Sequence, residues 1–158
     1  MGHIIYAEGV ATDPTKLETI TKWQAPTTVK KLRGFLGLTG CYRRFIKDYS
    51  NICQPLYAAL RKDNFQWGPQ QQQAFDTLKK VMTTPPMLSL PNFSQPFVLE
   101  TDSCQNGIGA VLMQNNKPLA YFSKCLGPRA QAQSIYEKEA LAILWALKKW
   151  RHYFLAVQ

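Results

Sequence analysis

Asp102 and Glu139 are the residues whose type and setting are best suited to chemistry. Asp102 lies between two apolar runs that alternate like strands, residues 97–99 and 108–112, with an Asn-Gly turn signal before the second. Residues two apart on a strand share a face, so Glu100 and Asp102 point the same way. The stretch therefore predicts a hairpin that carries a carboxylate on a rigid strand. A second interpretation stays open, that Asp102 simply opens the turn, as aspartates commonly do.

Glu139 belongs to a predicted helix with a strong start signal. Ser134 and Glu137 form an S-x-x-E capping box, and the helix is expected to run to about Phe154. On a helical wheel, Glu139 lies about 60° from the centre of the apolar stripe, at the edge of the predicted buried face. The residues of that stripe, which recur at helical spacing, are Tyr136, Ala140, Ile143, Leu147, Trp150 and Phe154.

A long helix that folds over the predicted sheet would bring Glu139 close to Asp102. Two carboxylates at close range repel each other, and a divalent cation relieves that repulsion. Mg²⁺ keeps several of its waters, which suits metal-assisted hydrolysis of a phosphodiester. Two carboxylates are too few for a two-metal site, and no acidic residue follows Glu139 in the sequence. The alternative is that Glu139 pairs with a lysine such as Lys138 or Lys148 along the rim of the helix.

Positive charge is concentrated in one segment. Residues 22–62 hold nine basic residues and one acidic residue, Asp48, and so carry +8 of the net charge of +9. Because apolar residues at helical spacing back these cations, we expect a basic helical face. Such a face contacts nucleic-acid phosphates by releasing condensed counterions, but a charge run on a helix is also typical of a solvated face. The candidate contacts are Lys30, Lys31, Arg33, Arg43, Arg44 and Lys47.

The helical segment after residue 27 carries two further patterns. Gly34, Gly37 and Gly40 recur every three residues, which in a helix brings one side close to a neighbouring backbone. We therefore expect a tight helix pair there. The helical pattern continues in a second apolar stripe, formed by Tyr42, Phe45, Ile46 and Tyr49.

Prolines and changes of periodicity divide the chain into three parts. Residues 1–22 alternate as a short hairpin and then open a helix with an Asp-Pro pair. Residues 23–84 are predicted to form the basic helices. Residues 85–158 begin at a pair of prolines and hold three predicted strands and the long helix. The fold class is therefore α/β in its α+β arrangement.

Cysteine usage and hydropathy exclude several other classes. The four cysteines include no C-x-x-C pair and the chain has two histidines, so a zinc site is not expected. No apolar run reaches the roughly 18 residues of a membrane span, and no signal-peptide pattern opens the sequence. These features predict an intracellular protein with reduced thiols, in the cytoplasm or the nucleus, without a membrane partner.

Several motifs carry a family resemblance that covers essentially the whole chain. FVLETDSCQNGIGAVLMQNNKPLAYFSKCL and YEKEALAILWALKKWRHYF resemble the first half of the ribonuclease H domain of reverse transcriptases from gypsy-type long-terminal-repeat retrotransposons. VKKLRGFLGLTGCYRRFIKDYSNICQPLYAAL resembles the thumb and connection of the same polyproteins, and MGHIIYAEGVATDPTKLETI resembles the end of their palm. The resemblance implies a small helical thumb/connection module followed by an incomplete RNase H-like domain, with three antiparallel strands and one long helix.

The same resemblance implies roles for the two carboxylates. Asp102 and Glu139 match the first two catalytic residues and metal ligands of a Mg²⁺ site that cleaves the RNA strand of an RNA–DNA hybrid. The family's other two ribonuclease acids, and the paired aspartates of its polymerase, have no counterpart in this sequence. Because charge stabilisation depends on a complete site, we expect weak metal binding and no cleavage by this chain alone.

Two functions therefore stay open at this point. The first is a fragment of a retrotransposon-derived reverse transcriptase polyprotein that binds RNA/DNA hybrid or duplex nucleic acid and carries part of a ribonuclease site. The second is a catalytically inactive, domesticated or degenerate fragment that binds a protein partner through an open sheet edge. The remaining segments of the polyprotein are expected partners in either case.

Overall fold

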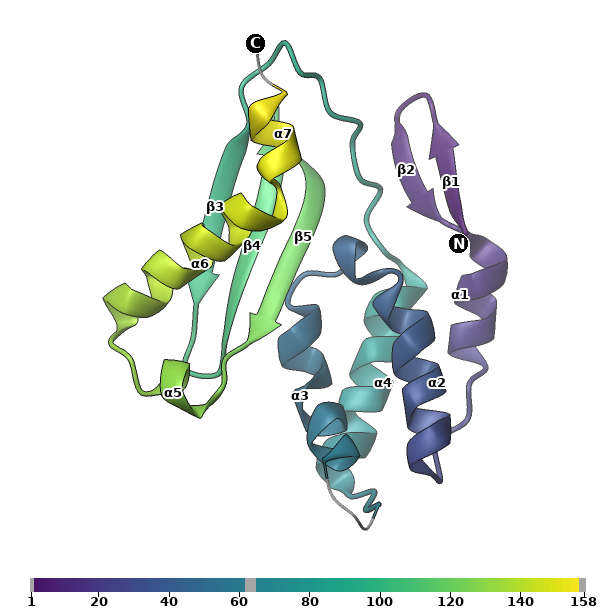
Figure 1. Cartoon of the computed structure of the whole chain (residues 1–158). Coiled ribbons are helices and arrows are strands. Elements are labelled where there is room, and N and C mark those ends of the chain that lie inside the picture. The colour runs from purple at the N-terminus through teal and green to yellow at the C-terminus, as the bar shows by residue number, and fades with distance from the viewer. Residues whose placement is uncertain (1, 62–64, 157–158) are drawn as a thin grey trace.

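Figure 1 shows two bodies packed side by side, a group of helices and a sheet crossed by one long helix. The computed structural model describes residues 2–61 and 65–156, so Lys62 of the predicted basic segment lies outside them. We call residues 2–61 and 65–88 the helical body and residues 89–156 the sheet body. Within these described ranges, no helix is long and apolar enough to cross a membrane.

The order of the elements confirms the predicted mixture of helices and strands. A hairpin comes first, four helices and a short 3₁₀ turn follow, and three strands and three helices complete the described chain. The elements are β1 (His3–Tyr6), β2 (Gly9–Thr12), α1 (Pro14–Thr21), α2 (Val29–Gly40), η1 (Arg43–Phe45), α3 (Tyr49–Leu60), α4 (Pro69–Thr83), β3 (Val98–Ser103), β4 (Gly107–Gln114), β5 (Lys117–Cys125), α5 (Pro128–Gln131), α6 (Ile135–Lys149) and α7 (Arg151–Leu155).

Helices α1 to α4 enclose the larger core. Its centre is aromatic: the ring centroid of Phe35 lies 4.7 Å from that of Phe75 and 6.0 Å from that of Trp23. The predicted N-cap of α1 is confirmed, because the Asp13 carboxylate accepts a hydrogen bond of 2.9 Å from the Thr15 N–H. This core belongs to the helical body alone except for Tyr121 of β5, which packs against it.

The segment between α2 and α3 differs from the predicted continuous helix. All four apolar residues of the predicted second stripe are buried, but the segment forms only the short turn η1 before α3 begins. Asp48 has a φ of 57°, a left-handed conformation that an α-helix cannot contain. The cations around η1 are therefore carried by an irregular connection between two helices.

The predicted tight helix pair at the glycines of α2 is wrong. A Cβ added at Gly37 would meet nothing within 4 Å, and one added at Gly34 or Gly40 would meet its nearest neighbour at 3.7 Å. These are ordinary contacts or open space. The glycines of α2 are not required by packing against the described residues.

The β1–β2 hairpin is confirmed, and it docks on the segment that follows α4. Val10 and Leu88 exchange two backbone hydrogen bonds, of 2.7 and 2.9 Å. Gly9 permits this approach, because a Cβ there would lie 2.3 Å from the Leu88 carbonyl oxygen. Leu88 is fully buried in the core of the helical body, which anchors the hairpin to that body.

The sheet body has β4 at its centre, antiparallel to β3 on one side and β5 on the other. Asn115 and Asn116 have φ values of 50° and 59°, the positive values that a two-residue type I′ hairpin needs at both central positions. Leu99, Leu112 and Ala120 are aligned across the three strands and share a core with α6. One face of the sheet is therefore the α6 face.

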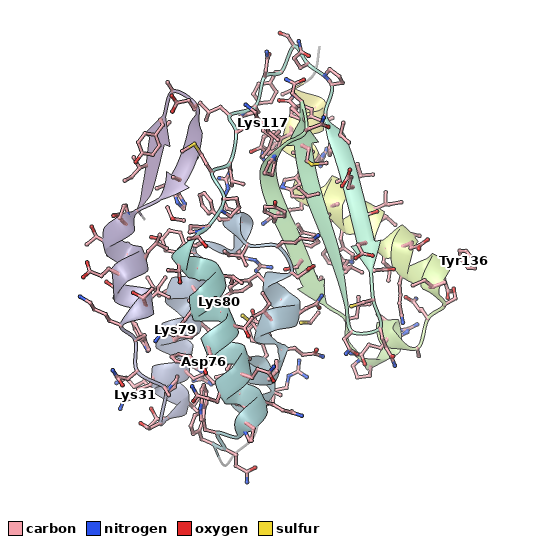
Figure 2. The ribbon with its side chains drawn as sticks, turned by 180° about the vertical axis from the view of Figure 1, so that it is seen from behind. Lys31, Asp76, Lys79, Lys80, Lys117 and Tyr136 are labelled. Carbon is pink, nitrogen blue, oxygen red and sulfur yellow. The ribbon has the colours of Figure 1, made fainter. Side chains whose placement is uncertain are left out.

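Helix α6 packs on the sheet with a face other than the predicted one. The capping box is confirmed: Glu137 accepts from the Ser134 N–H at 2.8 Å, and Ser134 Oγ accepts from the Glu137 N–H at 3.3 Å. The predicted stripe is wrong along the length of α6. Its first residue, Tyr136, is 79% exposed and points away from the sheet (Figure 2). The exposed part of the predicted stripe comprises Tyr136, Ala140, Ile143 and Leu147, whereas the buried residues of α6 are Lys138, Ala142 and Ala146.

The reason lies in the composition of α6. Its apolar residues occupy more than one side, so helical spacing alone does not say which side meets the sheet. The alanines give the helix a flat side that packs closely on β3 and β4. Trp150, which follows the last residue of α6, is buried as predicted, and the chain continues into α7.

Candidate functional site

Asp102 lies inside β3, paired with Gly109 and one residue before the strand ends. It therefore does not open the turn, and that interpretation is wrong. Glu100 and Asp102 are both exposed, whereas Leu99 belongs to the core that α6 covers. By strand alternation, both carboxylates point to the face of the sheet opposite α6.

A hollow of about 120 Å³ lies on that opposite face, where the sheet meets the helical body. Glu100 and Asp102 line it from β3, and Lys47 and Asp48 line it from the connection between η1 and α3. Asp48 can approach because a Cβ at Gly109 would lie 3.2 Å from its Oδ1. The sequence prediction missed Asp48 as a neighbour of the sheet carboxylates; a glycine inside a strand, which marks close approach, is the signal for it.

Glu139 lies in the first turns of α6, which project beyond β3 in both views (Figures 1 and 2). Its side chain is exposed, and in the described part of the chain it forms no ion pair with Lys138, Lys148 or another cation. As expected, α6 packs over the sheet that carries Asp102, but it covers the face opposite to that carboxylate. To meet, the two carboxylates would have to reach past β3, which is an edge strand that pairs with β4 alone among the described residues.

The donor set does not complete a metal site. Among residues 2–61 and 65–156, no group of three His, Cys, Asp or Glu side chains is arranged to hold a metal ion. Mg²⁺ requires six oxygen ligands in near-octahedral geometry, of which proteins commonly supply one or two carboxylates and leave the rest to water or substrate phosphate. Asp102 and Glu139 therefore do not form a two-metal site by themselves.

The predicted nucleic-acid contacts on α2 and after η1 are open to solvent. Lys30, Lys31 and Arg33 are exposed on α2, and Lys47 is exposed beyond η1. Lys31 Nζ donates to Thr27 Oγ1 at 3.1 Å, a neutral partner. The ion pair found among the described residues joins Lys22 and Glu18. These four cations are therefore not paired with a described carboxylate and are available to bind an external anion.

Arg43 and Arg44 are partly engaged inside the protein. Arg43 Nη2 donates to the Ser123 carbonyl oxygen at 3.0 Å, and so joins η1 to β5. Ser50 strengthens this joint: its N–H donates to Ser123 Oγ and its hydroxyl donates to the Ser123 carbonyl, both at 2.9 Å. The Arg44 guanidinium carbon lies 5.8 Å from the Phe45 ring centroid, and Arg44 is half-buried. Arg43 thus holds the two bodies together, a role that the charge pattern did not predict.

The thiol of Cys53 is buried near this joint. Burial raises the pKa of Cys53 to about 12, which favours the protonated thiol at neutral pH. Nearby, the Tyr49 hydroxyl lies 2.9 Å from Thr39 Oγ1, and burial raises the pKa of Tyr49 as well. These groups serve packing between α2 and α3.

Comparison with known proteins identifies the family. Residues 67–158 match the family described as the RNase H-like domain found in reverse transcriptase. The chain belongs to this reverse transcriptase family. The resemblance is therefore confirmed, and the three-stranded antiparallel sheet with its helix lies within the matched RNase H-like region.

Curated relatives of this chain are retrotransposon polyproteins. It is 40% identical to the Retrovirus-related Pol polyprotein from transposon 297 of Drosophila melanogaster over 160 residues, covering 100% of this chain and 15% of the relative. It is 34% identical to the polyprotein from transposon gypsy of the same organism, covering 97% of this chain and 16% of the relative. The Transposon Tf2-3 polyprotein of Schizosaccharomyces pombe is 35% identical, with 97% and 12% covered. The chain spans less than a fifth of the length of these relatives.

Solved structures of a viral reverse transcriptase share the fold. The foamy viral protease-reverse transcriptase in complex with RNA/DNA hybrid matches with a TM-score of 0.86 at 21% identity, covering 94% of this chain and 21% of that one. The same protein in complex with dsDNA matches with a TM-score of 0.83 at 19% identity, covering 99% and 35%. Since both matches span the helical body and the sheet body, the two bodies occur together in one known architecture.

Proposed function

We propose that this chain is the part of a retrotransposon polyprotein that holds RNA/DNA hybrid or duplex nucleic acid by its sugar-phosphate backbone. The observation that carries the proposal is the set of exposed cations without carboxylate partners. Cations contact phosphates without reading the bases, so binding is independent of sequence and weakens with salt. The foamy viral relatives in complex with RNA/DNA hybrid and dsDNA support the same class of partner. The contact residues proposed are the exposed Lys30, Lys31, Arg33, Arg43 and Lys47, together with the half-buried Arg44.

Within that polyprotein, the sequence motifs support an assignment of the segments. Residues 1–22 would end the palm, residues 23–84 would form the thumb/connection, and residues 85–158 would form the first half of the RNase H-like domain. The family match covers the last of these segments and begins earlier, at residue 67. The compartment proposed for such a polyprotein is the cytoplasm or the nucleus.

Asp102 and Glu139 are the residues proposed to contribute to a ribonuclease site. RNase H-like domains of reverse transcriptases generally use Mg²⁺, which would supply positive charge where phosphodiester cleavage develops negative charge. Both carboxylates are exposed and form no ion pair with a described residue, so their oxygen atoms are available to bind a metal ion. Because the donor set is incomplete, the remaining ligands must come from other polyprotein segments, and no cleavage step is assigned to this chain alone.

The binding proposal is tested by fluorescence anisotropy with a labelled RNA/DNA hybrid. The variant carries Lys30→Gln, Lys31→Gln and Lys47→Gln; its control carries Lys16→Gln, Lys80→Gln and Lys117→Gln, three exposed lysines with the same loss of charge. We expect the first triple variant to bind roughly tenfold more weakly or worse, and the control to stay close to the parent chain. Equal weakening of both would show a general charge effect and refute the assigned face.

The ribonuclease part has a separate test, a gel assay of hybrid cleavage with Mg²⁺. We expect no cleavage by the chain alone, with Asp102→Asn indistinguishable from the parent chain. Robust cleavage that Asp102→Asn abolishes would contradict the conclusion that this chain lacks a complete site.

A second candidate function, protein interaction, is favoured by the outer side of α6. Leu144 is 64% exposed, and it lies among other exposed apolar side chains of the helix. Strand β3 adds an edge that no described residue pairs. Exposed apolar patches and strand edges are typical of association surfaces. Binding of a separately produced downstream polyprotein segment, with no binding of hybrid, would favour this candidate over the first.

A further inference from the structure

A second group of cations surrounds Trp145. It is separate from the hollow lined by Glu100 and Asp102, which we call the carboxylate hollow. Lys124 Nζ lies 3.8 Å from the Trp145 ring centroid, and Lys148 Nζ lies 5.3 Å from the same centroid. The group borders a hollow of about 360 Å³. Its lining comes from η1, β5 and α6 and consists of Arg43, Phe122, Lys124, Trp145, Lys148 and Lys149.

This hollow is strongly positive. Its lining contains four cations and no carboxylate, and none of the four forms an ion pair with a residue in the described ranges. Two ammonium groups close to one ring repel each other, and the negative face of the indole offsets that repulsion only in part. An anion in the hollow would relieve the repulsion that remains.

The chemistry of the lining selects the kind of anion. Lys124 covers the Trp145 ring at 3.8 Å, so that side of the ring is not free for a stacked base. The hollow presents several positively charged N–H donors, from Arg43 of η1 and from Lys148 and Lys149 of α6. Donors of this kind match phosphate oxygens. The carboxylate hollow, by contrast, is lined by three carboxylates, Asp48, Glu100 and Asp102, and by one cation, Lys47, so its interior is less favourable for an anion.

We propose that the hollow around Trp145 binds a phosphodiester group of the nucleic-acid backbone. It rests on the nucleic-acid binding proposed above and adds a second anchor, on the sheet body, to the contacts of the helical body. Arg43 belongs to both sets, because it lines the hollow and also joins η1 to β5 through the Ser123 carbonyl. A duplex held at both places would bridge the two bodies.

The first experiment compares hybrid affinity over a series of salt concentrations for Lys148→Gln/Lys149→Gln and for the control Lys80→Gln/Lys117→Gln. Both variants lose two exposed lysines, and Lys124 is kept because it packs on Trp145. We expect the pocket variant to reduce the slope of log affinity against log salt by about 2, one for each lost phosphate contact. The control should keep the slope of the parent chain. Equal slopes for the pocket variant and the parent chain would overturn the proposal.

A second measurement uses the parent chain, and so does not depend on the folding of a variant. Acetylation of Lys124, Lys148 and Lys149, followed by mass spectrometry, should fall when hybrid is added, whereas acetylation of Lys80 should not. Protection by inorganic phosphate without protection by hybrid would overturn a backbone site. If the parent chain binds hybrid and Lys30→Gln/Lys31→Gln/Lys47→Gln weakens it, but these three lysines stay reactive, the pocket proposal alone fails. If the parent chain binds no hybrid, both proposals fail.

Discussion

The two bodies of this chain bury their large apolar side chains to different extents. The helical body surrounds an aromatic core, with Phe35, Tyr42 and Tyr49 almost fully buried. The sheet body buries one face of three strands beneath α6 and leaves large apolar side chains of that helix in solvent. The two bodies belong to one chain, so the difference lies in how each packs. The sheet body leaves more apolar surface exposed for a binding partner than the helical body does.

The comparison predicts unequal costs of core and surface truncation. Phe35→Ala should lower the free energy of unfolding by about 3–5 kcal/mol, because it removes a fully buried ring that packs on Phe75. Leu144→Ala, on the outer side of α6, should change that free energy by less than about 0.5 kcal/mol. Urea unfolding measures both. A loss at Leu144 as large as that at Phe35 would mean that the outer side of α6 is already covered in solution.

Two glycines sharpen the same contrast within the helical body. Gly9→Ala should destabilise the fold by about 1–3 kcal/mol, because its Cβ would lie 2.3 Å from the Leu88 carbonyl oxygen. Gly37→Ala should stabilise α2 by about 0.5–1 kcal/mol, since its Cβ meets nothing within 4 Å and alanine is the better helix former. Thermal unfolding of the two variants gives both signs. Destabilisation by Gly37→Ala would indicate a close helix contact at this position, which the structure excludes.

How far the sequence predicts this fold depends on how local the signal is. The hairpin at the N-terminus, the Asp13 cap and the Ser134 capping box were all predictable, because each depends on residues within a few positions of one another. The buried side of α6 was not, since apolar residues on two sides of one helix satisfy the same spacing and only the sheet decides between them. The left-handed turn at Asp48 broke a helix that periodicity favoured.

The candidate site shows the same division. Spacing placed Glu100 and Asp102 together on one side of a strand, which the burial pattern of β3 supports. Spacing could not show that α6 covers the opposite face, because the covered face depends on which strand side chains pack against the alanines of α6. Nor could it show that Lys47 and Asp48 border the carboxylates, or that Arg43 binds the Ser123 carbonyl, contacts that depend on how the two bodies meet.

The smallest predicted effect concerns acid stability at the start of α6. Hydrogen bonds from the Ser134 N–H, and then from its hydroxyl, lower the pKa of Glu137 below its ordinary value. A lowered pKa gives stability that is present above the unfolded-state pKa and is lost as the pH falls through the folded-state pKa. Glu137→Gln should therefore flatten the acid side of a plot of stability against pH, and Ser134→Ala should flatten it less. An unchanged acid side would show that the capping box is not formed in solution.

The most direct test of the central claim, that exposed cations hold a nucleic-acid backbone, is the salt dependence of hybrid binding by the unmodified chain. Anisotropy titrations from about 50 mM to about 200 mM salt measure the slope of log affinity against log salt. Six cations in contact, each releasing roughly 0.9 counterions, give a slope of about −5, and contacts by Lys148 and Lys149 would steepen it by about 2. An affinity that does not change over this range would contradict the account.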